Sequence, residues 1–124
     1  MITKKAFLKT KPDAYDIIRF NGYSKDQVDV ETFLKTNPSS REIVLFNKHS
    51  KEQVDIKTFL KTNPSSYKIL CFNKFSKDQI DVKTFLKTNP NSLEIAKFNR
   101  YSKDQVSLFD RIRHFIFKNI TPKN

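Results

Sequence analysis

The sequence predicts an all-α protein built from tandem pairs of short helices. One motif recurs four times at a spacing of 26 residues, as in FNGYSKDQ from Phe20 and FNKHSKEQ from Phe46, and a fixed period of this length is typical of repeat arrays. The chain has a single glycine, and helix-cap signals alternate along each copy, which favours helices over strands. We therefore expect a short superhelical solenoid or a compact helical array.

The repeat divides the chain into a cap, four units and an extension. Residues 1–6 form an N-terminal cap, in which Thr3 is the N-cap of a shortened first helix. The units span residues 7–32, 33–58, 59–84 and 85–110. A basic extension, 111–124, completes the single domain. We expect Ser102 to start a helix that runs into this extension as far as about residue 119.

Two cap signals predict two helices in each unit. In Ser50-x-x-Gln53 the serine can cap a helix while the glutamine reaches back to it, as in a capping box. In Asn63-Pro64 the asparagine is a good N-cap and proline suits the first helical position. In the middle of the chain, these signals predict a first helix over about 51–62 and a second helix over about 64–73. The same signals stand at Ser24, Ser76, Ser102, Asn37 and Asn89.

The apolar residues of each unit form the predicted core. Phe59-Leu60 lies on the first helix, and Ile69 and Phe72 lie on the second with the Ile-x-x-Phe spacing of one helix face. Neither helix is long enough to be stable alone in water. Stacking of each unit on its neighbours must therefore bury these side chains.

The composition favours a polyanionic partner. The chain has 24 Lys and Arg against 13 Asp and Glu, which gives a net charge of +11. Cys71 is the only cysteine, so no disulfide can form within the chain. No apolar run approaches a membrane span, and the first residues lack the apolar region of a signal peptide. We expect an intracellular protein of the cytoplasm, nucleoid or nucleus, with no membrane partner.

The fourth unit resembles the helix-turn-helix of bacterial recombinases, transposases and small repressors. The resemblance covers Glu94-Ile95-Ala96, a turn, and Ser102-x-x-x-Val106, and Gly22 of the first unit stands where that family has its turn glycine. It implies that each S-K-D-Q begins a recognition helix that enters the major groove. Gln27, Gln53, Gln79 and Gln105 are then candidate base readers. Closure of the capping box is the alternative role for these glutamines.

Basic side chains recur at fixed positions of the unit. Lys25, Lys51, Lys77 and Lys103 would occupy the first turn of a helix, where the dipole disfavours cations, so their retention suggests an external phosphate. Simple copying of the lysine by duplication is the alternative. The other candidate phosphate contacts are Lys9, Lys35, Lys61, Lys87, Lys48, Lys74 and Arg100, and the basic tail adds Arg111, Arg113 and Lys118.

A second group of positions varies between units while the frame stays constant. One such position holds Tyr15, Arg41, Tyr67 and Leu93, and another holds Arg19, Leu45, Cys71 and Lys97. They form a predicted exposed stripe on the second helix, where they could read bases or vary neutrally. The candidate readers are Tyr15, Arg41, Tyr67, Arg19 and Lys97.

No pattern in the sequence predicts an enzyme. His49 and His114 do not recur, and the chain shows no metal-ligand spacing, glycine-rich phosphate loop or nucleophile with a base, so we expect no cofactor. Asp29, Asp55 and Asp81 are expected to pair with nearby lysines.

A DNA-binding array of αα units is the favoured interpretation, similar in architecture to the superhelices of TAL-effector-type proteins. Binding of RNA, or of an acidic protein by the solenoid, remains the alternative.

Overall fold

The computed structural model describes residues 2–120, and within this range the chain forms nine helices and no strand. Short and long helices alternate from α1 to α8, which confirms the predicted all-α repeat. The helices are α1 (Lys4–Lys9), α2 (Ala14–Tyr23), α3 (Val30–Leu34), α4 (Ser40–His49), α5 (Ile56–Leu60), α6 (Ser66–Phe75), α7 (Val82–Leu86), α8 (Ser92–Tyr101) and α9 (Leu108–Ile120).

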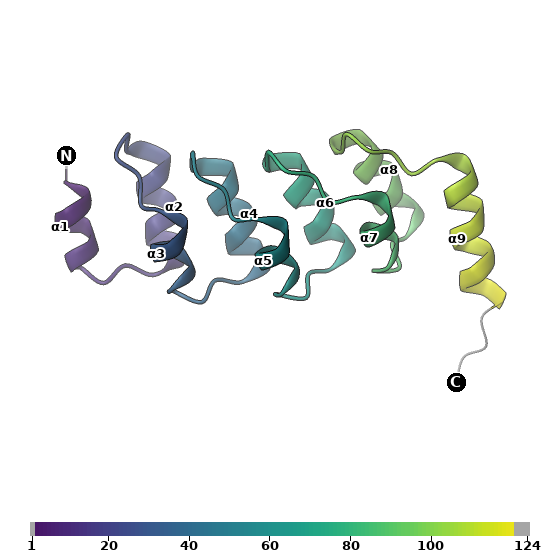
Figure 1. Cartoon of the computed structure of the whole chain (residues 1–124), viewed down its shortest axis with the longest axis horizontal. Coiled ribbons are helices and arrows are strands. Elements are labelled where there is room, and N and C mark those ends of the chain that lie inside the picture. Colours follow the sequence, from purple (N-terminus) through teal and green to yellow (C-terminus); the bar gives the residue numbers. More distant parts are fainter. Residues whose placement is uncertain (1, 121–124) are drawn as a thin grey trace.

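The long helices α2, α4, α6 and α8 form one layer, in which each helix packs on the next. The short helices α3, α5 and α7 lie against this layer, and α1 and α9 lie at opposite ends of the row (Figure 1). The loops that follow the long helices line one edge of the array, and the loops that precede them line the other. Each unit therefore meets only its neighbours, as in a solenoid.

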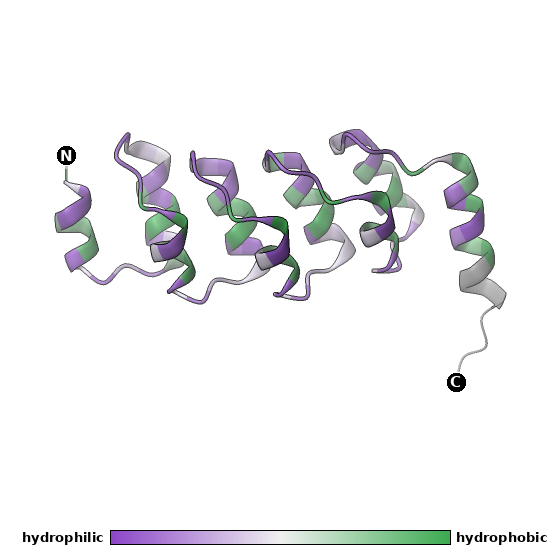
Figure 2. Ribbon diagram, in the orientation of Figure 1, coloured by the Kyte–Doolittle hydropathy of each residue, from purple (hydrophilic) through white to green (hydrophobic). Residues whose placement is uncertain are grey.

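Stacked phenylalanines join the two layers. Phe59 of α5 stacks on Phe72 of α6 with ring centroids 4.5 Å apart, and both side chains are fully buried. Equivalent pairs in the neighbouring units are Phe33–Phe46 and Phe85–Phe98, each at 4.1 Å. The predicted Phe core is confirmed. Figure 2 shows the hydrophilic loops that flank it.

The short helices begin later than the sequence predicted. Their N-caps are Asp29, Asp55 and Asp81, and the Asp55 carboxylate accepts the Thr58 N–H at 2.7 Å. The predicted helix over 51–62 is therefore α5 alone, because the residues before Asp55 are not helical. The expected pairing of these aspartates with lysines is replaced by helix capping.

The four serines predicted to start helices instead end them. Ser50 is the C-cap of α4, and its N–H donates to the Phe46 carbonyl at 2.9 Å. Ser24, Ser76 and Ser102 occupy the same position after α2, α6 and α8. The helix expected from Ser102 starts only at Leu108, where the Ser107 hydroxyl accepts the Asp110 N–H at 3.0 Å.

The asparagines predicted as N-caps instead lie in the loops between helices, where their backbone adopts the left-handed conformation. Asn63 has φ 55° and donates its N–H to the Leu60 carbonyl, a conformation that asparagine tolerates better than most residues. Asn37 and Asn89 have the same left-handed backbone conformation, with φ 56° and 60°. The N-caps of the long helices lie two residues later, at Ser39, Ser65 and Asn91, while Thr3 caps α1 as predicted.

At both ends of the array, positions that are apolar and packed in the middle units hold small or polar residues. Ile18, Val44 and Leu70 are buried, whereas Ala96 at the same position of α8 is exposed, because α9 does not pack on α8 in the way that each of the earlier long helices packs on the one before it. At the other end Arg19 is exposed, whereas Leu45 of the next unit packs against the core. Small or polar residues thus close both ends.

Candidate nucleic-acid interface

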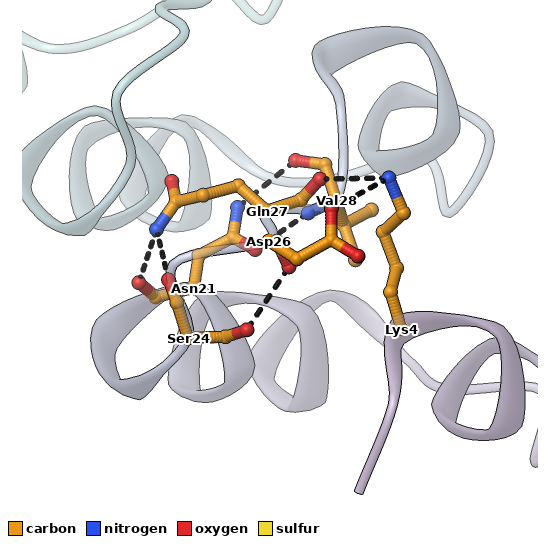
Figure 3. A network of polar contacts seen from close by, with 6 residues as sticks. All are labelled: Lys4, Asn21, Ser24, Asp26, Gln27 and Val28. Atoms are coloured by element: carbon orange, nitrogen blue, oxygen red, sulfur yellow. Dashed lines mark hydrogen bonds and ion pairs between the residues drawn. The ribbon is translucent and has the colours of Figure 1, made fainter.

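The repeated octet forms a loop that locks each unit to the next. The Asn47 amide accepts the Val54 N–H at 2.7 Å and donates to the Val54 carbonyl at 3.1 Å. It also donates to the Ser76 hydroxyl of the following unit at 2.9 Å. Since Asn47 is 2% exposed, these bonds satisfy a buried amide. Figure 3 shows the first copy of the loop, around Asn21 and Val28.

The glutamines take part in the same network. Gln53 Nε2 donates to the Asn47 and Ser50 carbonyls at 2.8 and 3.1 Å, and its Oε1 accepts the Lys77 N–H of the next unit at 3.2 Å. Gln27 and Gln79 make the same contacts one unit earlier and later. Gln105 donates to the Asn99 and Ser102 carbonyls. No S-K-D-Q segment begins a helix, so the recognition helices implied by the resemblance are absent from the described chain.

The lysines of the octet lie at the opposite end of a helix from the one expected. Lys25, Lys51, Lys77 and Lys103 directly follow the C-caps of the long helices, and all four are exposed. The helix dipole favours a cation at this end, so it does not oppose the lysine.

Two of the acidic residues beside the octet lysines bond to a short helix. The Glu52 carboxylate accepts the Val30 N–H of α3 at 3.4 Å, and the Asp104 carboxylate accepts the Val82 N–H of α7 at 3.3 Å. These acids reach the N-termini of short helices in the preceding unit. The octet lysines face solvent beside them.

A second basic column lies on the outer face of the long helices. Lys48, Lys74 and Arg100 are exposed and occupy one position of α4, α6 and α8. Lys48 Nζ lies 4.8 Å from the Phe75 ring centroid, and Lys74 Nζ lies 4.6 Å from that of Tyr101, so cation–π contacts link successive units.

Basic residues outnumber acidic ones on these three helices. The basic side chains are Arg41, Lys48, Lys68, Lys74, Lys97 and Arg100. The acids are Glu42 and Glu94, and both carboxylates accept the N–H of an N-cap residue at 2.9 Å in capping boxes. The outer face of α4, α6 and α8 therefore combines unpaired cations with aromatic rings, and we call it the basic–aromatic face.

The third basic column lies at the ends of the short helices. Lys35, Lys61 and Lys87 are the C-caps of α3, α5 and α7, and Lys9 ends α1. All four side chains are exposed. They precede the loops of the other edge, so the basic columns are spread over different sides of the array.

The variable stripe is exposed only in part. Tyr15, Tyr67 and Leu93 are 38%, 48% and 63% exposed, and Arg41 is exposed as well. At the second variable position Arg19 is exposed, whereas Leu45, Cys71 and Lys97 are half-buried. The expected solvent-facing stripe is wrong at Leu45 and Cys71, because both pack against the core. Charge repulsion from Cys71 raises the pKa of the Tyr67 phenol above its ordinary value of 10.0.

The residues of the basic tail differ in burial. Arg111 of α9 is half-buried at the position that phenylalanine holds in the other units, and its Nε has no hydrogen-bond partner. Arg113 is exposed, and the His114 ring lies 3.1 Å from the Pro90 carbonyl. The side chain of Lys118 lies outside those that the structure describes. An open groove of about 930 Å³ separates α7 from α9.

Few of the cations are neutralised within the chain. Among the side chains that the structure describes, the one ion pair joins Lys4 and Asp26 at 3.2 Å. No described helix is both long and apolar enough to cross a membrane.

Fold and surface together define an all-α tandem-repeat protein. Comparison with protein-family models, with curated proteins and with solved structures finds no match to the chain. The helix-turn-helix resemblance is therefore not supported by any family match.

Proposed function

We propose that the protein is a non-enzymatic nucleic-acid-binding array that holds phosphates with columns of lysine and arginine. One observation carries this proposal: exposed cations recur once per unit in register, while the described side chains form a single ion pair. Long helices that pack side by side lie about 8–10 Å apart, so each column offers a row of evenly spaced charges. A regular row of cations suits a polyphosphate backbone.

The basic–aromatic face is the strongest candidate surface. It has six basic residues on α4, α6 and α8, and hydrogen bonds to N-cap residues occupy its two acids. The octet lysines border the same layer at the C-terminal ends of its helices. Base reading by the glutamines is not part of this proposal, because Gln27, Gln53 and Gln79 use both ends of their amides to join the units.

The test compares affinities for duplex DNA, single-stranded DNA and RNA of one sequence across a salt series. Binding should weaken steeply with salt, and Lys48→Gln/Lys74→Gln/Arg100→Gln should reduce the slope by about 0.7–0.9 for each phosphate that the variant no longer neutralises. The matched control is Lys5→Gln/Lys57→Gln/Lys83→Gln, which removes the same charge from the short helices and should leave the slope unchanged.

Two results would overturn the proposal. If both triple variants lower affinity equally, net charge alone accounts for binding. If polyglutamate competes as well as nucleic acid does, the surface recognises acidic polypeptides instead.

A further inference from the structure

The second residue of each long helix forms an exposed column suited to stacking. Tyr15, Arg41, Tyr67 and Leu93 stand at the same position of α2, α4, α6 and α8, and all four are exposed. Phenol rings and guanidinium planes are the groups on which unpaired bases stack, and leucine offers apolar contact. None of the four is acidic, so the column does not repel a nucleotide.

The spacing of this column matches one base per unit. Successive long helices pack directly on one another, which places equivalent residues about 8–10 Å apart. A base held between two stacking groups needs about 7 Å, twice the roughly 3.4 Å separation of stacked bases. The interval between neighbouring members of the column therefore accepts one base and no more.

Cations flank the stacking column. Lys68 from the same helix and Lys97 from the next unit each place Nζ 5.7 Å from the Tyr67 ring centroid. Seven residues after Arg41, Tyr67 and Leu93, on the same helix face and about 10 Å along the axis, come Lys48, Lys74 and Arg100, whereas Gly22 holds this position after Tyr15. A backbone that follows this basic column can direct its bases toward the stacking column.

This geometry requires bases that are free of partners. In a duplex the bases are paired and stacked on one another, so reaching the column would require unstacking every base that inserts. A single strand meets no such barrier and can place its bases between successive units.

We infer that the basic–aromatic face, extended by Tyr15 of α2, binds single-stranded nucleic acid, with one base stacked in each of the three intervals between Tyr15, Arg41, Tyr67 and Leu93. This inference rests on the proposed function and specifies its ligand. The phosphates lie along Lys48, Lys74 and Arg100.

The experiment uses the full chain and oligothymidylates of increasing length. Affinity should rise with each added nucleotide up to about three, one per interval of the column, and should exceed the affinity for a duplex of equal length. The chain has four tyrosines and no tryptophan, so stacking on Tyr67 and Tyr15 should quench the tyrosine fluorescence.

Substitutions then separate stacking from phosphate contact. Tyr67→Ala should weaken binding at least about fivefold without changing the salt slope, whereas Tyr67→Phe should bind normally. Tyr23→Ala is the matched control, since Tyr23 is 80% exposed but lies outside the column. The thermal melting of each variant shows whether it is folded.

The outcomes distinguish this inference from the proposed function. If the chain binds no nucleic acid, both fail. If it binds duplex as tightly as single strands, or if Tyr67→Ala and Tyr23→Ala behave alike, the stacking inference fails while phosphate binding stands.

Discussion

Single side chains decide how neighbouring units are joined. Asn47 and Asn73 each make two bonds to the backbone of their own unit and one to a serine of the next. Asn99 keeps the two backbone bonds but has no following unit, and it is half-buried. Asn99 therefore differs from the other two in lacking the contact between units and in being less buried.

Asn73→Ala should lower the free energy of unfolding by about 2–4 kcal/mol, because the Ile80 N–H and carbonyl lose their buried partner together with the Ser102 hydroxyl. Asn99→Ala should have a clearly smaller effect, since its site is more open and lacks the bond between units. Urea denaturation of both variants measures the difference. Equal destabilisation at the two sites would show that the bond to the serine contributes nothing.

Lys77→Ala tests a lysine at the C-terminal end of α6. Because the helix dipole favours the cation there, the change should destabilise the fold by about 0.3–1 kcal/mol at low salt, and the effect should shrink as salt screens it. The same change should reduce the salt slope of nucleic-acid binding by about 0.7–0.9. Lys83→Ala is the control and should leave that slope intact. An unchanged slope for Lys77→Ala would remove this lysine from the interface.

At the scale of the helix, sequence reasoning predicted the fold class but misplaced the caps. The period and the Phe spacing are local patterns, so the repeat and the core could be read directly. The signal of Ser39-x-x-Glu42, a true capping box, was also present in the sequence. The S-x-x-Q pattern matched the same template, yet the bonds that join Asn47 to Val54 and Gln53 to Lys77 hold that segment in a non-helical loop. Contacts between units of this kind leave no local pattern.

The short helices should make stability depend on pH. A hydrogen bond from the Thr58 side chain and one from its backbone N–H lower the pKa of Asp55 from its ordinary value of 3.8, and Thr32 and Thr84 do the same for Asp29 and Asp81. Since folding lowers these pKa values, the stabilisation is complete above about pH 4 and is lost as the pH falls through the folded values.

Asp55→Asn keeps an N-cap but removes this titration. The variant should match the parent protein at pH 7 and lose less stability than the parent below about pH 4. Thermal melts over a pH series measure this difference in stability. The control is Asp78→Asn, because Asp78 caps no described helix. A parallel decline in acid for parent and Asp55→Asn would show that the cap does not titrate.

At the scale of the whole molecule, the array behaves as a sum of equivalent units. Deleting residues 59–84 joins Thr58 to Phe85 and restores every class of contact between the new neighbours. The shortened chain should fold, with a denaturant m-value lower by about one quarter. Deleting half of this unit breaks the register and should abolish cooperative unfolding. A full-unit deletion that fails to fold would show that the units are not interchangeable.

The asparagine and glutamine amides that join the octets all reach in one direction along the chain. The Asn47 and Gln53 amides reach forward to the next unit, over separations of 29 and 24 residues. During synthesis, the Asn and Gln amides of a unit that has left the ribosome therefore have no partner between units until the following unit emerges. Each newly made unit supplies the hydrogen-bond partners of the unit before it, so folding lags translation by one unit. In an interrupted chain, the last unit would always lack its hydrogen bonds to a following unit.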